Sequence, residues 1–374
     1  MSIITLSGVP VVSGELGLPL VGAWHLEAVL ATADAPVVGE SATLSLGGVP
    51  FVGAVVYSAS DSGNRVTVRV VGGRGGLGDT VAAKGYYQTT RKVVLADALG
   101  SVGESLSLTS DGLDVYLGHW TRLESTVADV VRHVAEHAGL NWRALADGSI
   151  WMGAETWLPL EVTHTLESEE PTREAFTVAL EAASVVPGVT FRGHQVSGVV
   201  YTFDSRKIRA RVSYGAARGE IQSILGELVR RETRKADYHG LYTARVDAQN
   251  SDDSLELTPT DARMPSLSNV PIRMGGVSSI RLVPGSTVLI GHEDGDPTKP
   301  VVTSLYMGTV QAATVSSIGT YEIQASEVKA GGSLSLVLHD VLAAAWSQLG
   351  LQNVGIGLTL PPLVGANTTI TKGA

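Results

Sequence analysis

The sequence predicts a mainly β fold (β+α), in which short strands dominate and a few short helices connect them. Val, Thr, Ser and Gly recur in short alternating runs, and Gly is abundant at 43 of 374 residues while aromatic residues make up only 5%. Such alternation is typical of strands with one buried face. The chain contains no Cys, which excludes disulfides and thiolate metal sites. Packing or subunit association must therefore stabilise it.

The first ninety or so residues are expected to form strands. VTVRVV at 66–71 alternates between apolar and polar positions. Residues 41–59 are expected to form two strands that turn at Gly47 and Gly48, since paired glycines accept the backbone angles of tight turns.

Two segments space their apolar residues as amphipathic helices do. The first spans 89–108, with Gly103 where the helix would end, and the second spans 126–145, with Gly139 as its C-cap. A helix, a glycine and a strand are expected in succession in both, which indicates a weak internal duplication. The expected stripes are Val93, Leu95, Leu99 and Val102 in the first and Val127, Val130, Val131, Val134 and Ala138 in the second.

Strands resume after residue 156, where AFTVALE at 175–181 and KIRARVSY at 207–214 both alternate. The basic side of the second strand either is solvated or contacts an acidic partner surface. The expected faces are Phe176, Val178 and Leu180 in the first strand, and Ile208, Ala210, Val212 and Tyr214 opposite Lys207, Arg209 and Arg211 in the second.

The clearest amphipathic helix is predicted at 219–236, with Glu220 at its start and basic residues at its end, as the helix dipole favours. We interpret it as a linker between two β regions. About five short strands follow in some 70 residues, the size of a small Greek-key barrel. They are expected at 241–249, 255–263, 270–276, 278–293 and 300–306.

Three motifs suggest chemistry. GRGGLG at 73–78 matches G-x-G-x-x-G, but a dinucleotide site needs a helix directly after it, and a loop is expected instead. HVAEH at 133–137 matches the inverted zinc-protease pattern, with His133 and His137 on one helix side. Against zinc, Glu136 points away from the histidines and no later helix offers an acidic third ligand. ESEEPTRE at 167–174 is expected to be a solvated loop.

Net charge and composition narrow the function classes. The formal net charge is −10, and the barrel region 236–310 holds five basic and nine acidic residues, which disfavours specific nucleic-acid binding. The N-terminus shows no signal peptide, and no apolar run approaches the ~18–20 residues that cross a bilayer.

The region Tyr242 to Tyr306 resembles the small barrel of contractile-tail spikes and of the valine-glycine repeat spikes of type VI secretion. In that family the last hairpin has a G-x-x-x-G-D-P turn followed by P-V-V. The matching residues here are Gly291, Gly295, Asp296, Pro297, Pro300, Val301 and Val302.

The preceding region is similar to phage tail hubs of the late control protein D family. GGRGGL followed by Tyr86 and VVLADALGSVGE matches the hub's glycine loop, tyrosine and helix ending in G-E, and residues 184–212 are similar to the hub's second β domain. This resemblance implies that residues 288–306 are a barrel hairpin without chemistry. Gly295 to Pro297 form its turn, and Glu293 and Asp294 lie at an exposed tip.

The resemblance implies a structural role without catalytic, cofactor-binding or metal-binding residues. A homotrimer would serve as baseplate hub and central spike of a phage tail or related injection device, adapt to the six-fold tail tube, and close or pierce at its tip. Its partners would be the tube protein or a tube-end adaptor, other baseplate proteins, a tape measure protein and a separate tip protein. It would reside in the virion after assembly in the host cytoplasm.

Two other functions remain open at this point: a zinc-dependent hydrolase that uses HVAEH, and a carbohydrate-binding barrel protein. Residues 309–374 could form a β-prism, a helical plug or an extended arm. The expected domains are a first hub β domain at 1–92, a small helix-containing domain at 93–155, a second hub β domain at 156–218, the linker helix at 219–236, an OB-fold barrel at 237–308 and the C-terminal tip region at 309–374.

Overall fold

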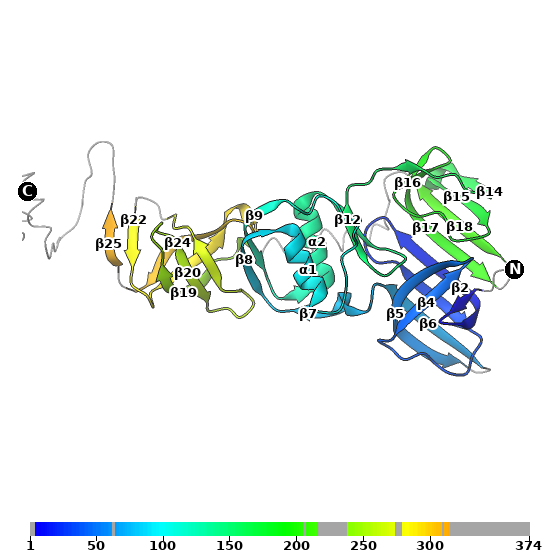
Figure 1. Cartoon of the computed structure of the whole chain (residues 1–374), viewed down its shortest axis with the longest axis horizontal. Helices are drawn as coiled ribbons and strands as arrows, with labels where there is room; N and C mark the ends of the chain where they lie inside the picture. The colour runs from blue at the N-terminus through cyan, green and yellow to red at the C-terminus, as the bar shows by residue number, and fades with distance from the viewer. Residues whose placement is uncertain are drawn as a thin grey trace, which may run out of the picture. The chain divides into compact units, whose positions relative to one another are not determined.

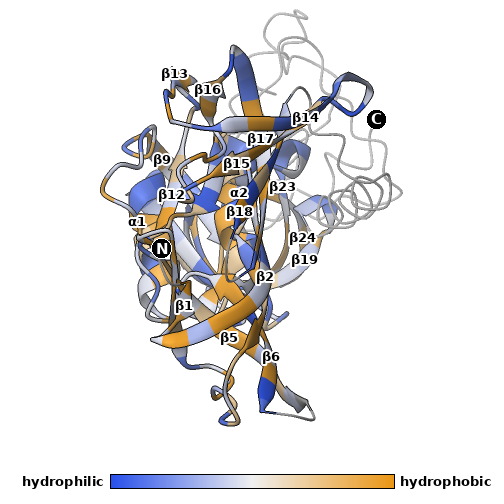
Figure 2. Cartoon of the chain, turned by 90° about the vertical axis from the view of Figure 1, so that its right-hand side faces the viewer, coloured by the Kyte–Doolittle hydropathy of each residue, from blue (hydrophilic) through white to orange (hydrophobic). Residues whose placement is uncertain are grey.

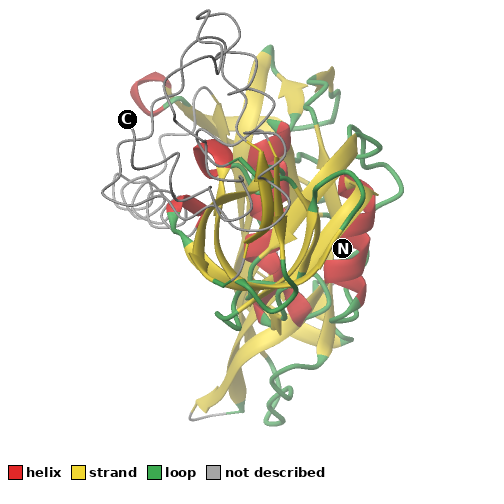
Figure 3. Cartoon of the chain, turned by 90° about the vertical axis from the view of Figure 1, so that its left-hand side faces the viewer, coloured by secondary structure: helices red, strands yellow, loops and turns green. Residues whose placement is uncertain are grey.

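The computed structural model describes residues 4–61, 64–204, 207–214, 238–273, 279–308 and 310–314. The chain divides into two compact units, Met1–Val315 and Ser316–Ala374, and the account below concerns the first. It confirms the predicted mainly β fold with short helices (Figure 3). The predicted linker helix at 219–236, and the tip region apart from residues 310–314, lie outside the described residues. Neither described α-helix has the length and apolar content needed to traverse a lipid bilayer.

The N-terminal strands form a closed barrel, in the order β1-β4-β5-β6-β3-β2 with β1 also paired to β2 (Figure 1). Buried residues alternate with less buried ones along β3, β4 and β6, and Val66, Val68 and Val70 are almost fully buried. Figure 2 shows hydrophobic and hydrophilic residues following one another along the sheet. The predicted turn at Gly47 and Gly48 is confirmed, because both have positive φ, 62° and 85°. The strands are β1 (Thr5–Leu6), β2 (Val9–Pro19), β3 (His25–Leu30), β4 (Ser41–Leu46), β5 (Val49–Asp61) and β6 (Arg65–Gly72).

A second set of strands continues this sheet, because β17 pairs with β2 from Gly198 opposite Pro19 to Asp204 opposite Ser13. The sheet then runs β17-β18-β15-β14 and ends at β14. The predicted inward faces of β15 and β18 are confirmed. The strands are β13 (Leu158–Pro159), β14 (Thr165–Glu170), β15 (Ala175–Leu180), β16 (Val189–Phe191), β17 (His194–Asp204) and β18 (Ile208–Tyr214).

A helical segment follows the glycine loop. Its elements are η1 (Gly76–Gly78), β7 (Thr80–Val81), β8 (Lys84–Thr90), α1 (Arg91–Gly100), β9 (Tyr116–Arg122), β10 (Ser125–Thr126), α2 (Val127–Ala138), β11 (Asn141–Ala144) and β12 (Ile150–Gly153). Helix α2 matches its prediction: Thr126 caps its start, Gly139 ends it at φ 65°, and Val127, Val130, Val131 and Val134 are buried.

Helix α1 is shorter than predicted and shows a different face. Thr90 caps it and Gly100 ends it, so Val102 lies beyond the helix. Val93 is 52% exposed, whereas Val94, Leu95, Ala98 and Leu99 are buried. The strand expected after Gly103 is reduced to a single bridge between Leu106 and Ile150, so only α2 shows the predicted helix–glycine–strand succession.

The C-terminal part of the unit is a five-stranded sheet in the order β21-β20-β19-β23-β24. A bridge between Ile272 and Val302 links its two ends, with Arg273 N donating to Val302 O at 2.8 Å and Val302 N to Pro271 O at 3.0 Å. The sheet therefore closes into a barrel. Its strands are β19 (Tyr242–Gln249), β20 (Leu255–Pro259), β21 (Leu267–Val270), β23 (Thr287–His292) and β24 (Pro300–Met307).

Two strand predictions in this barrel need correction. The strand expected at 270–276 lies earlier, at Leu267–Val270, because Pro271 follows it and has no N–H to donate. The single strand expected at 278–293 is two strands, because Gly285 at φ 90° and the Ser286 N to Val283 O hydrogen bond turn the chain. The first of these, β22 (Ser279–Leu282), pairs with β25 (Val310–Thr314) outside the five-stranded sheet.

Candidate functional site

The β23–β24 hairpin tip contacts the helical segment. Pro297 is buried, and its carbonyl oxygen accepts a hydrogen bond of 3.0 Å from Thr121 N of β9. Asp296 Oδ1 shapes the turn by accepting from Thr298 N at 2.8 Å and from Thr298 Oγ1 at 2.6 Å. The predicted turn with positive φ at Gly295 is confirmed, at 70°.

The prediction of a free, exposed tip is wrong except at Asp294, which is exposed. Glu293 is half-buried and forms an ion pair of 2.5 Å with Arg273 Nη1. Asp296 lies within 3.5 Å of Lys299 Nζ and 3.7 Å of His137 Nε2. The turn thus supplies a contact surface between two parts of the chain, which a local sequence pattern does not reveal.

His292, the last residue of β23, is only 8% exposed. Its Nε2 lies 3.2 Å from Thr121 Oγ1. Its ring meets the Tyr238 ring edge-on, with 5.1 Å between centroids, and the Tyr238 hydroxyl donates to Thr121 O at 2.9 Å. Burial lowers the pKa of His292 from 6.5 to about 4, although the nearby Asp296 carboxylate opposes the shift. The ring is therefore neutral at physiological pH.

The two histidines of HVAEH face the same interface. The centroids of His133 and His137 lie 5.3 and 5.2 Å from that of Trp120, which is buried. The His133 ring also lies 5.2 Å from that of Tyr238. Burial lowers the pKa of His137, Asp296 opposes this shift, and Arg91 and Lys299 reinforce it. We call His133, His137, His292, Trp120 and Tyr238 the histidine cluster.

The zinc hypothesis gains no support from this arrangement. His133 and His137 do share one side of α2, as predicted, but aromatic rings cover them and Glu136 is exposed. Across the described parts of the chain, no three His, Asp or Glu side chains gather in a way that could hold a metal ion.

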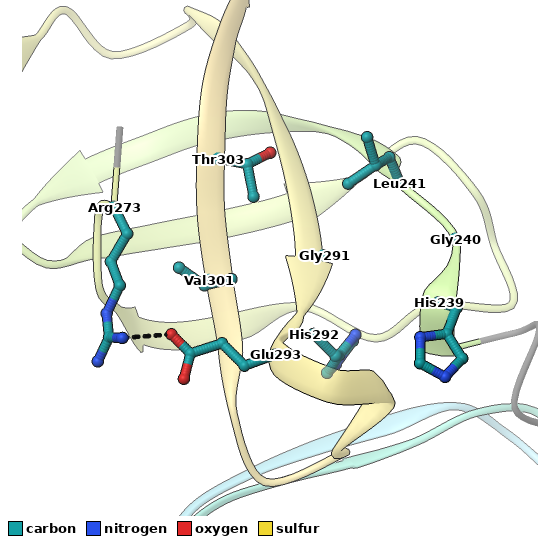
Figure 4. A pocket seen from close by; sticks show the side chains of 9 residues that line it. All are labelled: His239, Gly240, Leu241, Arg273, Gly291, His292, Glu293, Val301 and Thr303. Carbon is teal, nitrogen blue, oxygen red and sulfur yellow. Dashed lines mark ion pairs between the residues drawn. The ribbon is translucent and has the colours of Figure 1, made fainter. Parts of the chain in front are cut away.

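A pocket of about 310 Å³ opens beside the cluster (Figure 4). The His239 and His292 rings lie on one side of it and the Arg273–Glu293 ion pair on the other, as Figure 4 shows. The two charged side chains satisfy each other, so the pocket presents no paired acid and base. Its remaining lining residues are Gly240, Leu241, Gly291, Val301 and Thr303.

The glycine loop binds a carboxylate of its own chain. Gly73 and Gly75 have positive φ, 107° and 104°, which turns successive N–H groups to one side. Arg74 N and Gly76 N donate to Glu104 Oε1 at 2.8 and 2.9 Å. Glu104 is 5% exposed. The dinucleotide alternative is contradicted, because a side chain occupies these donors and the loop leads into η1 and β7 instead of a helix.

The carboxylate run and the basic face pair with each other. Lys207 Nζ and Arg209 Nε lie 3.0 and 2.8 Å from Glu167, and Arg211 Nη2 lies 3.5 Å from Glu170. The prediction of a loop at 167–174 is wrong for its first half, because β14 pairs with β15 there. The basic face thus pairs with carboxylates of its own sheet while its side chains stay 44–52% exposed, and contact with an acidic partner surface stays a prediction.

A further buried polar network was missed by the sequence analysis. Arg122, 6% exposed, donates to Asp97 Oδ2 at 2.9 Å and to the Tyr86 hydroxyl at 2.8 Å. Tyr86 donates to the same Asp97 oxygen at 2.6 Å, and Lys84 pairs with its other oxygen. Burial and the Asp97 hydrogen bond raise the pKa of Tyr86. Of these residues, the segments quoted for the hub resemblance contain Tyr86 and Asp97.

No family model matches this chain, and no curated protein matches its sequence. A solved Escherichia coli protein is similar at 14% identity and a TM-score of 0.52, over 81% of this chain and 99% of that one. It is described as a component of the type VI secretion system with structural similarity to the T4 tail proteins gp27 and gp5.

A prophage 43 kDa tail protein from Shewanella oneidensis matches at 10% identity and a TM-score of 0.46, over 57% of this chain and 98% of that one. Of these two similarities, that to the E. coli protein exceeds a TM-score of 0.5, and at its low identity it concerns the fold alone. The chain therefore shares its fold with a type VI secretion component that is itself similar to phage tail proteins, as the sequence resemblance indicated.

Proposed function

We propose that this protein is a structural component of a phage tail or tail-derived injection device, and that it forms the baseplate hub and central spike as a homotrimer. The observation that carries this proposal is the similarity to the E. coli type VI secretion component, which extends over 99% of that chain. It covers 81% of this chain, more than the sheet, the helical segment or the barrel alone, so it is not confined to one common module.

The use of polar residues agrees with a mechanical role. The motifs that suggested chemistry serve internal contacts: the glycine loop binds Glu104, the HVAEH histidines contact Trp120, and the basic face pairs with Glu167. A further contact, between Thr121 and Pro297, joins segments that are distant in sequence. A spike that transmits force along its length needs joints of this kind.

The closed barrel of β1 to β6 and the strands β13 to β18, which we call the half-barrel, are the two related β units of our proposal. Three chains would then present six such units to a six-fold tail tube. Strand β14 ends the large sheet and pairs only with β15 among the described strands. Edge strands present unpaired backbone groups, so we place a subunit contact there. We also propose that the chain is divided into the domains expected from its sequence, which are 1–92, 93–155, 156–218, 219–236, 237–308 and 309–374.

The proposed surroundings follow from the same model. The β units would contact the tail tube protein or a tube-end adaptor, and other baseplate proteins would surround them. The barrel and the C-terminal region would close or pierce at the tip, with a tape measure protein and a separate tip protein as further partners. The protein would reside in the virion tail.

Light scattering coupled to size exclusion tests the trimer directly. We expect a mass near three times the 39.0 kDa of one chain, constant over a tenfold dilution because obligate interfaces are large and apolar. A stable single-chain mass throughout the series would contradict the proposal.

A further inference from the structure

We propose that the contact between helix α2 and the β23–β24 hairpin is a pH-sensitive joint, in which protonation of His137 and His292 releases the barrel from the helical segment. This inference goes beyond the proposed function and holds for a single chain, because both sides of the joint belong to one polypeptide.

The hydrogen bonds and the burial of the residues at the joint support this proposal. Trp120 and Thr121 of β9 lie at its centre, and Thr121 alone receives three contacts from the barrel side: its N–H donates to Pro297 O, its carbonyl accepts from Tyr238, and its hydroxyl lies 3.2 Å from His292 Nε2. Thr121 is fully buried. Water is therefore excluded at Thr121, and the His292 ring, which is 8% exposed although it lines the pocket of Figure 4, would be poorly hydrated in its charged form.

The groups that face the histidines offer little compensation for a positive charge. His292 faces the neutral Thr121 and Tyr238, and Asp296 is the carboxylate that acts on it. The neighbouring Glu293 is already paired with Arg273.

The same carboxylate, Asp296, also serves His137, which in addition faces Arg91 of α1 and Lys299 of the hairpin. His133 meets the Trp120 and Tyr238 rings. The His239 imidazole lies against Gly295, where an added Cβ would come within 2.7 Å of Nε2. Among the described residues, Asp296 is thus the carboxylate that acts on both His137 and His292, while two permanent cations, Arg91 and Lys299, also act on His137.

The direction of the pH effect follows from burial. The docked state holds the pKa of His292 at about 4, whereas a solvated histidine titrates near 6.5. The separated state therefore binds the proton more tightly, and the joint weakens as pH falls below about 6.5. Between pH 7.5 and pH 5.0, His292 alone shifts the equilibrium toward separation about 30-fold. His137 acts in the same direction, since burial lowers its pKa too.

The test is a distance measurement across the joint in the full chain. The protein has no Cys, so the pair Ala96→Cys on α1 and Ser251→Cys on the β19–β20 turn gives two unique spin-label sites, both at exposed positions. The distance between the two labels is measured by pulsed electron–electron double resonance at pH 7.5 and 5.0. Excess unlabelled chain is added so that only distances within one chain contribute. We expect one narrow distribution at pH 7.5 and a broad, longer one at pH 5.0, restored on return to pH 7.5.

Two variants test whether His137 and His292 cause the change in distance at pH 5.0. The double variant His137→Gln/His292→Gln keeps polar side chains that do not titrate in this range, and it should retain the narrow distribution at pH 5.0. The control His25→Gln, at an exposed position on β3, should open as the parent does. Far-UV circular dichroism should stay constant over this range. An unchanged distance in the parent, opening of the double variant equal to the parent's, or loss of the dichroism signal over the same range would each overturn the proposal.

Discussion

The large sheet of β1 to β6 and β13 to β18 and the contact between α2 and the β23–β24 hairpin are held together by different kinds of interaction. In the sheet, side chains such as Phe176, Val178 and Tyr201 are at most 2% exposed. These three side chains do not titrate near neutral pH. In the joint, the contacts are hydrogen bonds and imidazole rings around Thr121. The chain therefore combines a scaffold held by buried apolar side chains with a contact held by polar groups.

The largest expected effect is in the scaffold. Phe176→Ala removes a ring that packs on Phe191 and Tyr214, at centroid distances of 5.8 and 5.6 Å, and it should lower the free energy of unfolding by about 3–5 kcal/mol. Urea denaturation followed by circular dichroism measures this loss. If the loss were below about 1 kcal/mol, the sheet core would not dominate stability as we describe.

Arg122→Met in the helical segment is expected to have the next largest effect. It removes charged hydrogen bonds to Asp97 and Tyr86 inside a largely buried network, and it should cost about 2–3 kcal/mol. The companion variant Arg69→Met breaks an ion pair with Glu27 in which both side chains are 57% exposed, and it should change stability by less than about 1 kcal/mol. Equal losses in the two variants would contradict the role of burial.

Glu104→Gln tests the glycine loop. The amide oxygen can still accept from Gly76 N, but the negative charge that strengthens both hydrogen bonds is lost, so we expect a loss of about 1–2 kcal/mol. Hydrogen exchange should speed up at Arg74 and Gly76 and stay unchanged in the barrel. Faster exchange throughout the barrel would show that the loop and the joint are not independent.

Thr121→Val should have the smallest effect on global stability and a local effect on the joint. The variant keeps the shape and the backbone contacts to Pro297 and Tyr238 but removes the hydroxyl beside His292 Nε2. We expect about 1 kcal/mol less stability for the joint and an upward shift in the pH at which the labelled pair of sites separates. An unchanged midpoint would mean that this hydrogen bond does not contribute.

Local patterns predicted most of the sheet and helix α2. Alternation located the strands that carry Val66 to Val70 and Phe176 to Leu180, and Gly139 marked the end of α2. Strand β14 was not predicted because its sequence, TLESEE, has almost no alternation of apolar and polar residues. Ion pairs to β18 contact this strand where buried apolar side chains would otherwise be expected. The phase of α1 was missed because Thr90, and not the apolar spacing, sets where that helix begins.

The joint could not be predicted in the same way. Thr121 and Pro297 are distant in sequence, and neither carries a motif for contact with the other. The HVAEH histidines were correctly placed on one side of α2, but only the fold shows that Trp120 and Tyr238 cover them. For Glu104 the sequence offered a partial indication. The G-E ending of the α1 region was part of the hub resemblance, but nothing in it indicated the contact with the glycine loop.

The central claim, a trimer that presents six β units around one axis, is tested most directly by electron microscopy of the purified full chain. Class averages viewed along the axis should show a ring of six similar densities with three-fold symmetry, built from the closed barrel and the half-barrel of each chain. Particles of single-chain size without rotational symmetry, at concentrations where the protein stays folded, would contradict the account.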